Sequence, residues 1–550
     1  MLYSSEDWIK NTQEWPINVE KRKAAEKVKL KDEEQQKPNG DSGKSNGVKQ
    51  EDDWRREAGQ NKHHDAYASD LDGQRDQQGK NDAQVKQKVG SEDERLQQKY
   101  SPQELALLHN LRQEKDYVFS LEQNDGKKRS PVADGHQLIS IDEADQFTPD
   151  NWIPRSDKLI RLTGKHPMNA EPELTSLFDA GLITPNELHY VRNHGPVPHL
   201  LWETHTLEIE GASLSLTMDE LKDNFDPINI PVALACDGNR RKELNQIKRS
   251  KGFNWASGAV SCAYWKGPKL RDVLRKAGVP EAFPGGKRYW VNFEGADDLS
   301  DGKYATCIPF EYAMDANNDV ILAYEMNDVP LPPDHGHPIR LVIPGYVGGR
   351  CVKWLKKIWL SDRENDSHYH IWDNRVLPSF ITEMDGEFSK TMFSHPDTLC
   401  NEQNLNSVIV KPAQGEKISL AEARKGKTYR IMGYAYDGGG HEVQRVEISL
   451  DEGDTWLYCV RKVWRAHIRA DITIVLIYVK FPDWPIRHGN KYWTWLHWYL
   501  DVEITHLLRA KSVTVRCHNV FKNTQPERPS WNIMGYVFTL FLSLTSSTPA

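Results

Sequence analysis

The character of the amino-acid sequence changes near residue 150, and this change limits how much of the chain can pack into folded domains. Residues from about 20 to 100 are rich in Lys, Gln, Asp, Glu and Gly and contain few aliphatic side chains. Such a segment cannot bury enough apolar surface to offset the entropy lost on folding. We therefore predict a polar, largely disordered N-terminal extension over residues 1–149.

From Asp150 onward, short β-rich runs alternate with short amphipathic helices. Residues 217–220 have the composition of a helix capping box, and residues 268–277 predict a helix that is closed by Gly278. The run over residues 340–344 is typical of a buried strand. This mixture predicts an α+β domain over residues 150–380.

After about residue 380 the pattern becomes mostly β. Val446, Ile448 and Leu450 alternate with polar residues, and a turn at residues 451–454 leads into a second apolar run. This is the signature of a β-hairpin, and further strand-like runs predict a β-sandwich over residues 381–535.

Composition and charge argue against several classes of protein. The net charge of -8 is not that of a basic nucleic-acid-binding protein. The seven cysteines form no CxxC pair or zinc-type ladder, and the N-terminus has no apolar signal region, so we expect reduced thiols in the cytoplasm. The late apolar run at residues 536–544 is too short to span a membrane.

Cys236 is the first candidate for chemistry. A cysteine after an apolar strand is usually a small buried hydrophobe. Here, however, a turn at Asp237-Gly238 follows at once and leads to Arg240 and Arg241. A thiolate beside guanidinium groups is expected to have a lowered pKa and to be available to a high-valent metal.

Arg192 is the second cationic candidate. It precedes the rigid segment Gly195-Pro-Val-Pro198. Together with Arg241 it could bind a planar oxyanion through forked hydrogen bonds.

A third group of residues suggests a phosphate site. Asp334-His335-Gly336 is followed by Arg340, and the small residues of the segment 345–349 precede Lys353. Small residues let backbone amides approach a phosphate, and the cations complement its charge. The sequence contains no P-loop and no strand-GxGxxG-helix fingerprint, so an ordinary nucleotide site is not indicated.

These segments occur in the order and spacing of the sulfite oxidase family, in the form found in eukaryotic assimilatory nitrate reductases. The resemblance covers about residues 150–535 and rests on several linked motifs. They are Tyr190-Val-Arg-Asn-His194, Cys236-Asp-Gly-Asn-Arg-Arg241, Gly252-Phe-Asn-Trp255, Phe293-Glu-Gly-Ala-Asp297, Asp334-His-Gly-His-Pro-Ile-Arg340 and Gly348-Gly-Arg-Cys-Val-Lys353.

The resemblance implies a sulfite-oxidase-type mixed α+β molybdopterin domain followed by an immunoglobulin-like dimerisation domain. It implies that Cys236 is the protein ligand of molybdenum in Mo-molybdopterin. The residues implied to bind the cofactor are Tyr190, Val191, Arg192, Asn193, His194, Asp297, His335, Arg340, Cys351, Val352 and Lys353. The residues implied to be catalytic are Arg192, Arg241, Trp255 and Asn374.

Asn374 separates two branches of the family. Sulfite oxidases carry a tyrosine near this point, whereas Asn374-Arg-Val-Leu-Pro378 looks like a nitrate reductase. The resemblance therefore implies a homodimeric enzyme that reduces nitrate to nitrite. The alternatives are a sulfite oxidase-type enzyme and a non-catalytic dimeric remnant of the family.

The sequence departs from the family pattern in three places. Asp237 stands where the family usually has Ala, and we expect its side chain to point outward from the turn. Residues 463–479 interrupt a run that the family joins directly, and our hypothesis is a retained intron. Residues 536–550 resemble an unrelated, aberrant tail in place of the family's last active-site methionine and its haem and flavin domains. Haem and FAD are therefore expected only in a full-length member, and electrons must come from a separate donor domain or protein.

Overall fold

The computed structural model describes residues 140–211, 214–461, 487–536 and 542–545, together with single positions between residues 96 and 133. The chain divides into two compact units, residues 14–108 and the remainder, and the description below concerns the remainder. Most of the predicted N-terminal extension and the whole predicted insert at residues 463–479 lie outside the described residues. None of the described helices has both the length and the apolar character that a membrane span needs.

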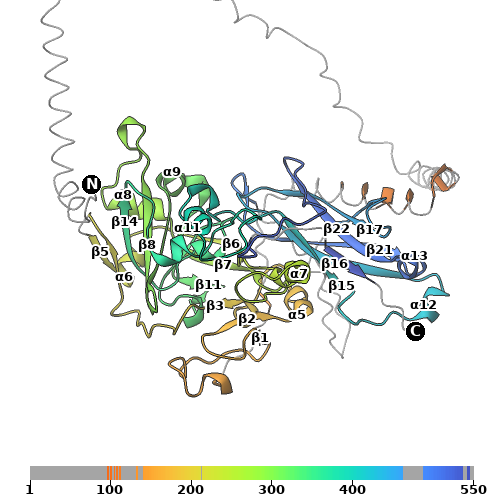
Figure 1. The fold of residues 1–550 in the computed structure, drawn as a ribbon, viewed down its shortest axis with the longest axis horizontal. Coiled ribbons are helices and arrows are strands. Elements are labelled where there is room, and N and C mark those ends of the chain that lie inside the picture. Colours follow the sequence, from red (N-terminus) through yellow and green to blue (C-terminus); the bar gives the residue numbers. More distant parts are fainter. Residues whose placement is uncertain are drawn as a thin grey trace, which may run out of the picture. The chain divides into compact units, whose positions relative to one another are not determined.

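The first domain is built mainly of sheets, with short helices between them (Figure 1). Among its described strands, β4 pairs with β14 in parallel and the other pairings are antiparallel. One sheet has the order β1 (Leu159–Arg161), β2 (Asn169–Pro172) and β3 (Val191–Arg192), and a larger one has β5 (Leu214–Thr217), β4 (Thr206–Ile209), β14 (Leu355–Ser361), β8 (Trp290–Leu299) and β9 (Gly302–Pro309). A further sheet has the order β12 (Val329–Pro330), β11 (Glu325–Met326), β7 (Val260–Pro268) and β6 (Pro227–Ala235). Strands β10 (Ile321–Ala323) and β13 (Arg340–Val342) form a two-stranded sheet.

The helices are short and connect the strands. The α-helices are α5 (Leu174–Asp179), α6 (Met218–Asp223), α7 (Arg241–Ile247), α8 (Leu270–Lys276), α9 (Phe310–Met314), α10 (His368–Ile371), α11 (Glu387–Phe393), α12 (Leu420–Ala423) and α13 (Ile504–Arg509). The 3-10 helices are η1 (Glu143–Asp145), η2 (Asn186–Leu188), η3 (Pro284–Gly286), η4 (Ala316–Asn318), η5 (Pro333–His335), η6 (Gly348–Arg350) and η7 (Pro396–Thr398).

The predicted local elements are present. Thr217 and Glu220 form a reciprocal capping box at the start of α6, and α8 forms where residues 268–277 predicted a helix. The apolar alternation around Val446 forms β17 (Val443–Ser449), which pairs with the short strand β18 (Leu457–Tyr458) as a hairpin. These predictions are confirmed. They could be made from sequence because each rests on local side-chain chemistry.

The second domain is a β-sandwich, as predicted. One sheet has the order β15 (Asn406–Lys411), β16 (Thr428–Tyr436) and β21 (Leu496–Glu503). The other has the order β18 (Leu457–Tyr458), β17 (Val443–Ser449), β22 (Ser512–Asn519) and β23 (Leu542–Thr545). Strands β19 (Arg487–His488) and β20 (Lys491–Tyr492) form a small separate ribbon. The two inner faces share one apolar cluster, which also includes residues of β6 and β7. The hairpin β6–β7 therefore belongs to the cores of both domains.

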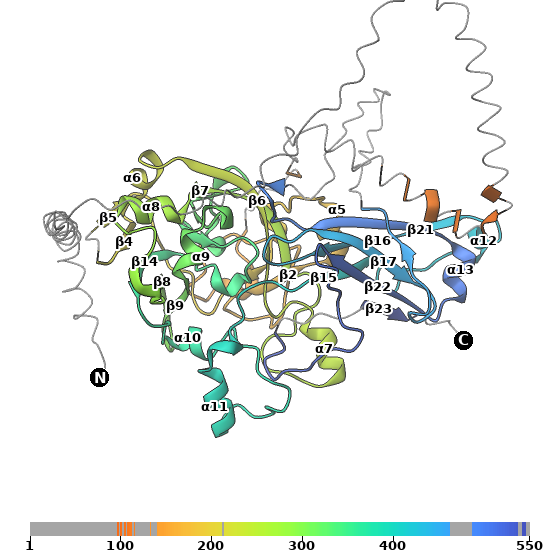
Figure 2. The same cartoon turned by 90° about the horizontal axis from the view of Figure 1, so that it is seen from above.

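After β22 the chain returns to the first domain. Trp531 Nε1 donates to the carbonyl of Lys248 at 2.9 Å, and Lys251 N donates to the carbonyl of Ile533 at 2.7 Å. Ile533 and its neighbours pack with residues that precede and include α11, which projects from the sheets in Figure 2. Arg241 Nε, at the start of α7, also donates to the carbonyl of Met534, so residues 531–536 form a closing segment along α7.

Gly267 in β7 provides a test of how closely β7 approaches β10. A Cβ at this position would overlap the carbonyl oxygen of Leu322 and lie 2.9 Å from Cα of Ala323. Because these obstacles are backbone atoms, we expect Gly267→Ala to destabilise the protein by about 1–3 kcal/mol. Thermal unfolding measures the effect.

Gly386→Ala is the matched control, because the nearest atom to its Cβ would be Ser389 Oγ at 3.8 Å. An unchanged melting temperature for Gly267→Ala would contradict the close approach of β7 and β10.

Candidate active site

A cavity of about 130 Å³ lies at the end of β6, beside the start of α7. It is lined by His189, Tyr190, Arg192, His194, Leu234, Cys236, Asp237, Arg241, Gly252, Phe253, Trp255, Asp297, Tyr304, Asp334, His335, Arg340, Gly348, Gly349, Cys351, Lys353, Trp354, Asp373, Asn374 and Tyr536. The structure therefore brings together most of the residues that the sequence motifs singled out.

Three of the predicted cofactor-binding residues do not line this cavity. Val191 and Val352 are buried in apolar clusters. Asn193 supports the cavity from outside, because its Nδ2 donates to Asp334 Oδ1 at 2.8 Å and its Oδ1 accepts from Lys353. The side chains of these residues hold the wall of the cavity in place.

Strand pairing fixes the position of Cys236. Strands β6 and β7 pair along their full length, and Cys236 N donates to the carbonyl of Ala259 at 2.9 Å just beyond the last paired residue. The thiol is 9 % exposed and borders the cavity. The expectation of a lowered thiol pKa is wrong for this structure: burial and the carboxylate of Asp237 raise the pKa of Cys236, and Arg241 offsets only part of the rise.

The side chain of Asp237 points inward, which corrects the expectation that it would point outward. The residue is 7 % exposed and lines the cavity, and Cys236 Sγ lies 3.5 Å from its Oδ1. Its Oδ2 is buried and has no hydrogen-bond partner. Burial, reinforced by Asp373, raises the pKa of Asp237 to about 6. An acidic group therefore stands directly beside the predicted metal ligand.

Arg192 and Arg241 present free donors to the cavity. Nη1 of Arg192 donates to Asn169 Oδ1 at 3.2 Å and to the carbonyl of Asn193 at 2.7 Å. Arg241 donates from Nε to the carbonyl of Met534 at 3.0 Å and from Nη1 to the carbonyl of Phe253 at 2.7 Å. Within the described residues, Nη2 of either arginine has no protein acceptor. These bonds fix both guanidinium groups and leave N–H donors for a ligand.

The opposite wall is formed by Asp373 and Asn374. Asp373 Oδ2 lies 3.2 Å from His194 Nε2, and its Oδ1 accepts from the hydroxyl of Tyr536 and from Asn374 N. Asn374 Nδ2 donates to the hydroxyl of Tyr304 at 3.2 Å. Burial lowers the pKa of His194 to about 4, and the histidine and nearby Arg192 hold the pKa of Asp373 below its usual value in spite of burial. Asn374 itself does not titrate.

A second set of cations lies toward η5 and η6. Arg340 donates to the carbonyls of His335 and Cys351 at 3.1 and 3.2 Å, while its buried Nε has no partner. Lys353 donates to the carbonyls of Arg192 and Asp334 at 3.0 and 2.9 Å. Burial lowers the pKa of Lys353 to about 7 and that of His335 to about 3, and the nearby charge of Arg340 lowers both further.

These four cations share the cavity with the carboxylates of Asp237, Asp297, Asp334 and Asp373, but they form no direct ion pair with them. Among the described residues, no ion pair involves Arg192, Arg241, Arg340 or Lys353. Buried cations are normally paired, because transfer of an isolated charge out of water is costly. The four cations therefore make this cavity a candidate anion site.

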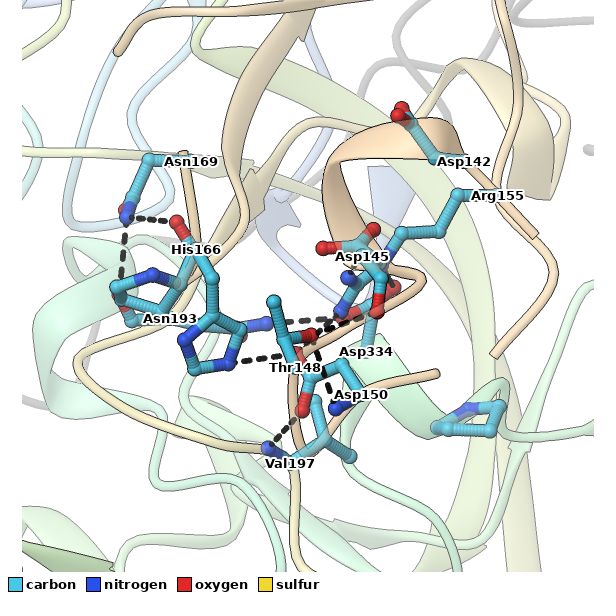
Figure 3. Close-up of polar contacts among 12 residues, drawn as sticks. Asp142, Asp145, Thr148, Asp150, Arg155, His166, Asn169, Asn193, Val197 and Asp334 are labelled. Carbon is cyan, nitrogen blue, oxygen red and sulfur yellow. Dashed lines mark hydrogen bonds and ion pairs between the residues drawn. The ribbon is translucent and has the colours of Figure 1, made fainter. Parts of the chain in front are cut away.

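An ion network behind the cavity holds Asp334 (Figure 3). Buried Arg155 contacts Asp145, Asp150 and Asp334 at 2.7, 2.8 and 2.7 Å. These contacts hold the pKa of Asp334 below its usual value in spite of burial. Since Lys353 donates to the carbonyl of Asp334, the network fixes one wall of the anion site.

Sequence reasoning missed several lining residues. Asp373 adjoins the predicted Asn374, so its position in the motif was a usable signal. His189 likewise adjoins Tyr190. No local signal marks Tyr304, and Tyr536 falls in the segment predicted as an aberrant tail. Tertiary contacts alone bring these two residues to the cavity.

Comparisons with known proteins agree with this geometry. A family model described as the oxidoreductase molybdopterin binding domain matches residues 194–369, and one described as the Mo-co oxidoreductase dimerisation domain matches residues 397–545. The crystal structure of the sulfane dehydrogenase SoxCD from Paracoccus pantotrophus is similar in fold, with a TM-score of 0.50 and 20 % identity over 78 % of this chain and 95 % of that one.

Curated relatives are more similar in sequence. The chain is 45 % identical over 402 residues to a nitrate reductase (NAD(P)H) of Hordeum vulgare and 45 % identical over 404 residues to a nitrate reductase (NADH) of Spinacia oleracea. In both cases the match covers 72 % of this chain. It covers 42 % of the first relative and 41 % of the second, so the chain spans less than half the length of the relatives it matches.

The ion network makes a prediction about stability. Arg155→Leu would leave buried carboxylates without their main cation, and we expect a loss of about 3–5 kcal/mol in the free energy of unfolding. Urea unfolding checks this. Lys390→Leu, which breaks an exposed ion pair with Glu387, is the control and should cost less than about 1 kcal/mol. Equal effects of the two changes would show that the network does not hold the fold.

Buried neutral histidines predict a pH dependence. Burial lowers the pKa of His194 and His370 to about 4, from an ordinary value of 6.5. Between these values the unfolded chain binds the proton and the folded one does not, so stability is full above about pH 6.5 and falls toward pH 4. Each such histidine contributes about 1.4 kcal/mol per pH unit.

The comparison of His370→Gln with His395→Gln tests this dependence. His370 is fully buried and its Nδ1 lies 3.0 Å from Nη1 of Arg350, whereas the side chain of His395 is 45 % exposed. Unfolding free energies measured from pH 7 to pH 4.5 should fall less steeply for His370→Gln than for His395→Gln. Identical slopes would refute the assignment of a neutral His370.

Proposed function

Because this chain belongs to the molybdopterin oxidoreductase family and corresponds to the molybdenum-domain region of eukaryotic nitrate reductases, we propose that it is an enzyme that reduces nitrate to nitrite. One observation carries the proposal. Arg192 and Arg241 present free guanidinium donors to the cavity that Cys236 borders, and in the described part of the chain no carboxylate forms an ion pair with either of them. A small oxyanion supplies the missing negative charge.

The residues of the cavity fit Mo-molybdopterin. Arg340 has a buried Nε without an acceptor, and Lys353 stands beside it with a lowered pKa, so both would gain from the cofactor's phosphate. A Cβ at Gly348 would lie 2.6 Å from the hydroxyl of Tyr190, so only glycine keeps this wall close to the cavity. The Cys236 thiolate would hold the metal. When bound, the cofactor supplies two-electron oxygen-atom transfer.

The protein's own groups would bind and orient nitrate. Arg192 and Arg241 hold two of its oxygens and stabilise charge that grows on the oxygen being removed. Asn374 orients the anion with an amide donor that stays neutral at every physiological pH. Trp255, which is 1 % exposed, forms an apolar wall that excludes water. Each nitrate takes up two electrons and two protons and gives nitrite and water.

We further propose that the protein acts as a homodimer in the cytoplasm and receives its electrons from a separate donor domain or protein. The match to a dimerisation domain over residues 397–545 supports the homodimer. All seven cysteines are buried thiols, which supports a reducing compartment.

Asp237 favours a second candidate, a dimeric family member without turnover. Its inward carboxylate opposes the positive field beside Cys236. If this repulsion dominates, Asp237→Ala should raise either the molybdenum content or the activity.

The test uses the full chain produced in a host that supplies the molybdenum cofactor. We expect nitrite to form from nitrate with reduced methyl viologen, and no sulfite oxidation with ferricyanide. Arg192→Gln should lower kcat/KM for nitrate by about 100-fold or more, because it removes charge from the transition state. Arg430→Gln in β16, which breaks an exposed pair with Asp501 in β21, should leave kcat/KM unchanged.

Other outcomes would contradict the proposal in distinct ways. Sulfite oxidation without nitrate reduction would indicate a sulfite oxidase-type enzyme. Absence of both activities in protein that contains molybdenum would favour the member without turnover.

A further inference from the structure

Tyr536 borders both the active-site cavity and a neighbouring cleft. It is 9 % exposed and lines the cavity. It also lines an open cleft formed by residues 376–379, 399–404 and 526–532. The tyrosine therefore stands between the cavity and this cleft.

The ring of Tyr536 faces Arg241. Cζ of the arginine lies 4.8 Å from the ring centroid, which is a cation–π distance. Two glycines approach the guanidinium closely, because a Cβ at Gly238 would lie 2.6 Å from Nη2 and a Cβ at Gly252 would lie 2.8 Å from Nη1. Two backbone carbonyls and one aromatic ring thus define where this cation sits.

The position of Tyr536 is itself fixed. Its N donates to Asn532 Oδ1 at 3.2 Å, and its carbonyl accepts from Asn532 Nδ2 at 3.0 Å. Its hydroxyl donates to Asp373, whose other oxygen lies by His194. Because Asp373 is engaged in this way, it does not pair with Arg241, and the ring takes the place of a carboxylate beside the cation.

We propose that Tyr536 is a positioning residue that holds Arg241 through its ring and thereby sets the affinity of the cavity for a small oxyanion. A neutral ring stabilises the guanidinium without cancelling its charge, so Nη2 keeps its full attraction for the ligand. A carboxylate in the same place would form an ion pair and weaken anion binding. The inference deepens the proposed function, on which its kinetic test rests.

The first experiment compares Tyr536→Phe with Tyr536→Leu in the molybdenum-loaded full chain. Phe keeps the ring, so we expect KM for nitrate within about threefold of wild type. Leu fills the space in an apolar cluster but lacks the ring, so we expect KM to rise on the order of tenfold with a smaller change in kcat. Tyr429→Phe is the matched control, since it removes a phenol–carboxylate bond to Glu416 on the surface.

A second experiment separates electrostatics from packing. Replacement of Tyr536 by pentafluorophenylalanine keeps the ring's shape and reverses the charge distribution on its face. We expect KM to rise above that of Tyr536→Phe at an unchanged melting temperature, which a purely structural role would not produce. If Tyr536→Leu fails to fold, the pentafluorophenylalanine variant still tests whether the ring of Tyr536 acts through its charge distribution.

A third readout does not depend on turnover. Nitrate should raise the melting temperature of cofactor-free wild-type chain and of Tyr536→Phe, at constant ionic strength with chloride, and should raise that of Tyr536→Leu less. If wild type binds nitrate but does not reduce it, the proposed function fails while the role of Tyr536 stands. Equal nitrate binding and equal KM for the Phe, Leu and pentafluorophenylalanine variants would overturn the role of Tyr536.

Discussion

Unpaired positive charge in a buried cavity is the constraint on which the rest of the site depends. Arg192, Arg241, Arg340 and Lys353 line one small cavity, and within the described structure none forms an ion pair. The protein stabilises them with backbone carbonyls, which orient each cation without cancelling its charge. Cations held in this way attract an anionic cofactor and an anionic substrate.

Separate parts of the chain hold this arrangement. The hairpin β6–β7 delivers Cys236 and Arg241 from a core shared by both domains, and the closing segment of residues 531–536 returns from the β-sandwich to cover Arg241. The network around Arg155 fixes Asp334 and, through its carbonyl, Lys353. The β-sandwich therefore contributes to the site as well as to the predicted dimer.

The features of the fold and the site that could be predicted from sequence depend on local chemistry or on linked motifs. The capping box at Thr217 and the hairpin at Val446 follow from local sequence, and the grouping of Cys236 with Arg192 and Asn374 follows from the family resemblance; all three agree with the structure. The orientation of Asp237 and the pKa of Cys236 did not follow, because both depend on burial, which residue order does not reveal. Tyr536 was assigned to a tail because only the return of the chain after β22 brings it to the cavity.

We propose that the cavity is a molybdenum-cofactor site anchored by Cys236. Its most direct test is the molybdenum content of the full chain, purified from a host that makes the cofactor, compared with that of Cys236→Ser. We expect about one molybdenum atom per wild-type chain, since one thiolate serves one metal, and a large loss or a changed metal spectrum in the variant. Trace molybdenum in the wild-type protein, or the same content and spectrum in both proteins, would contradict it.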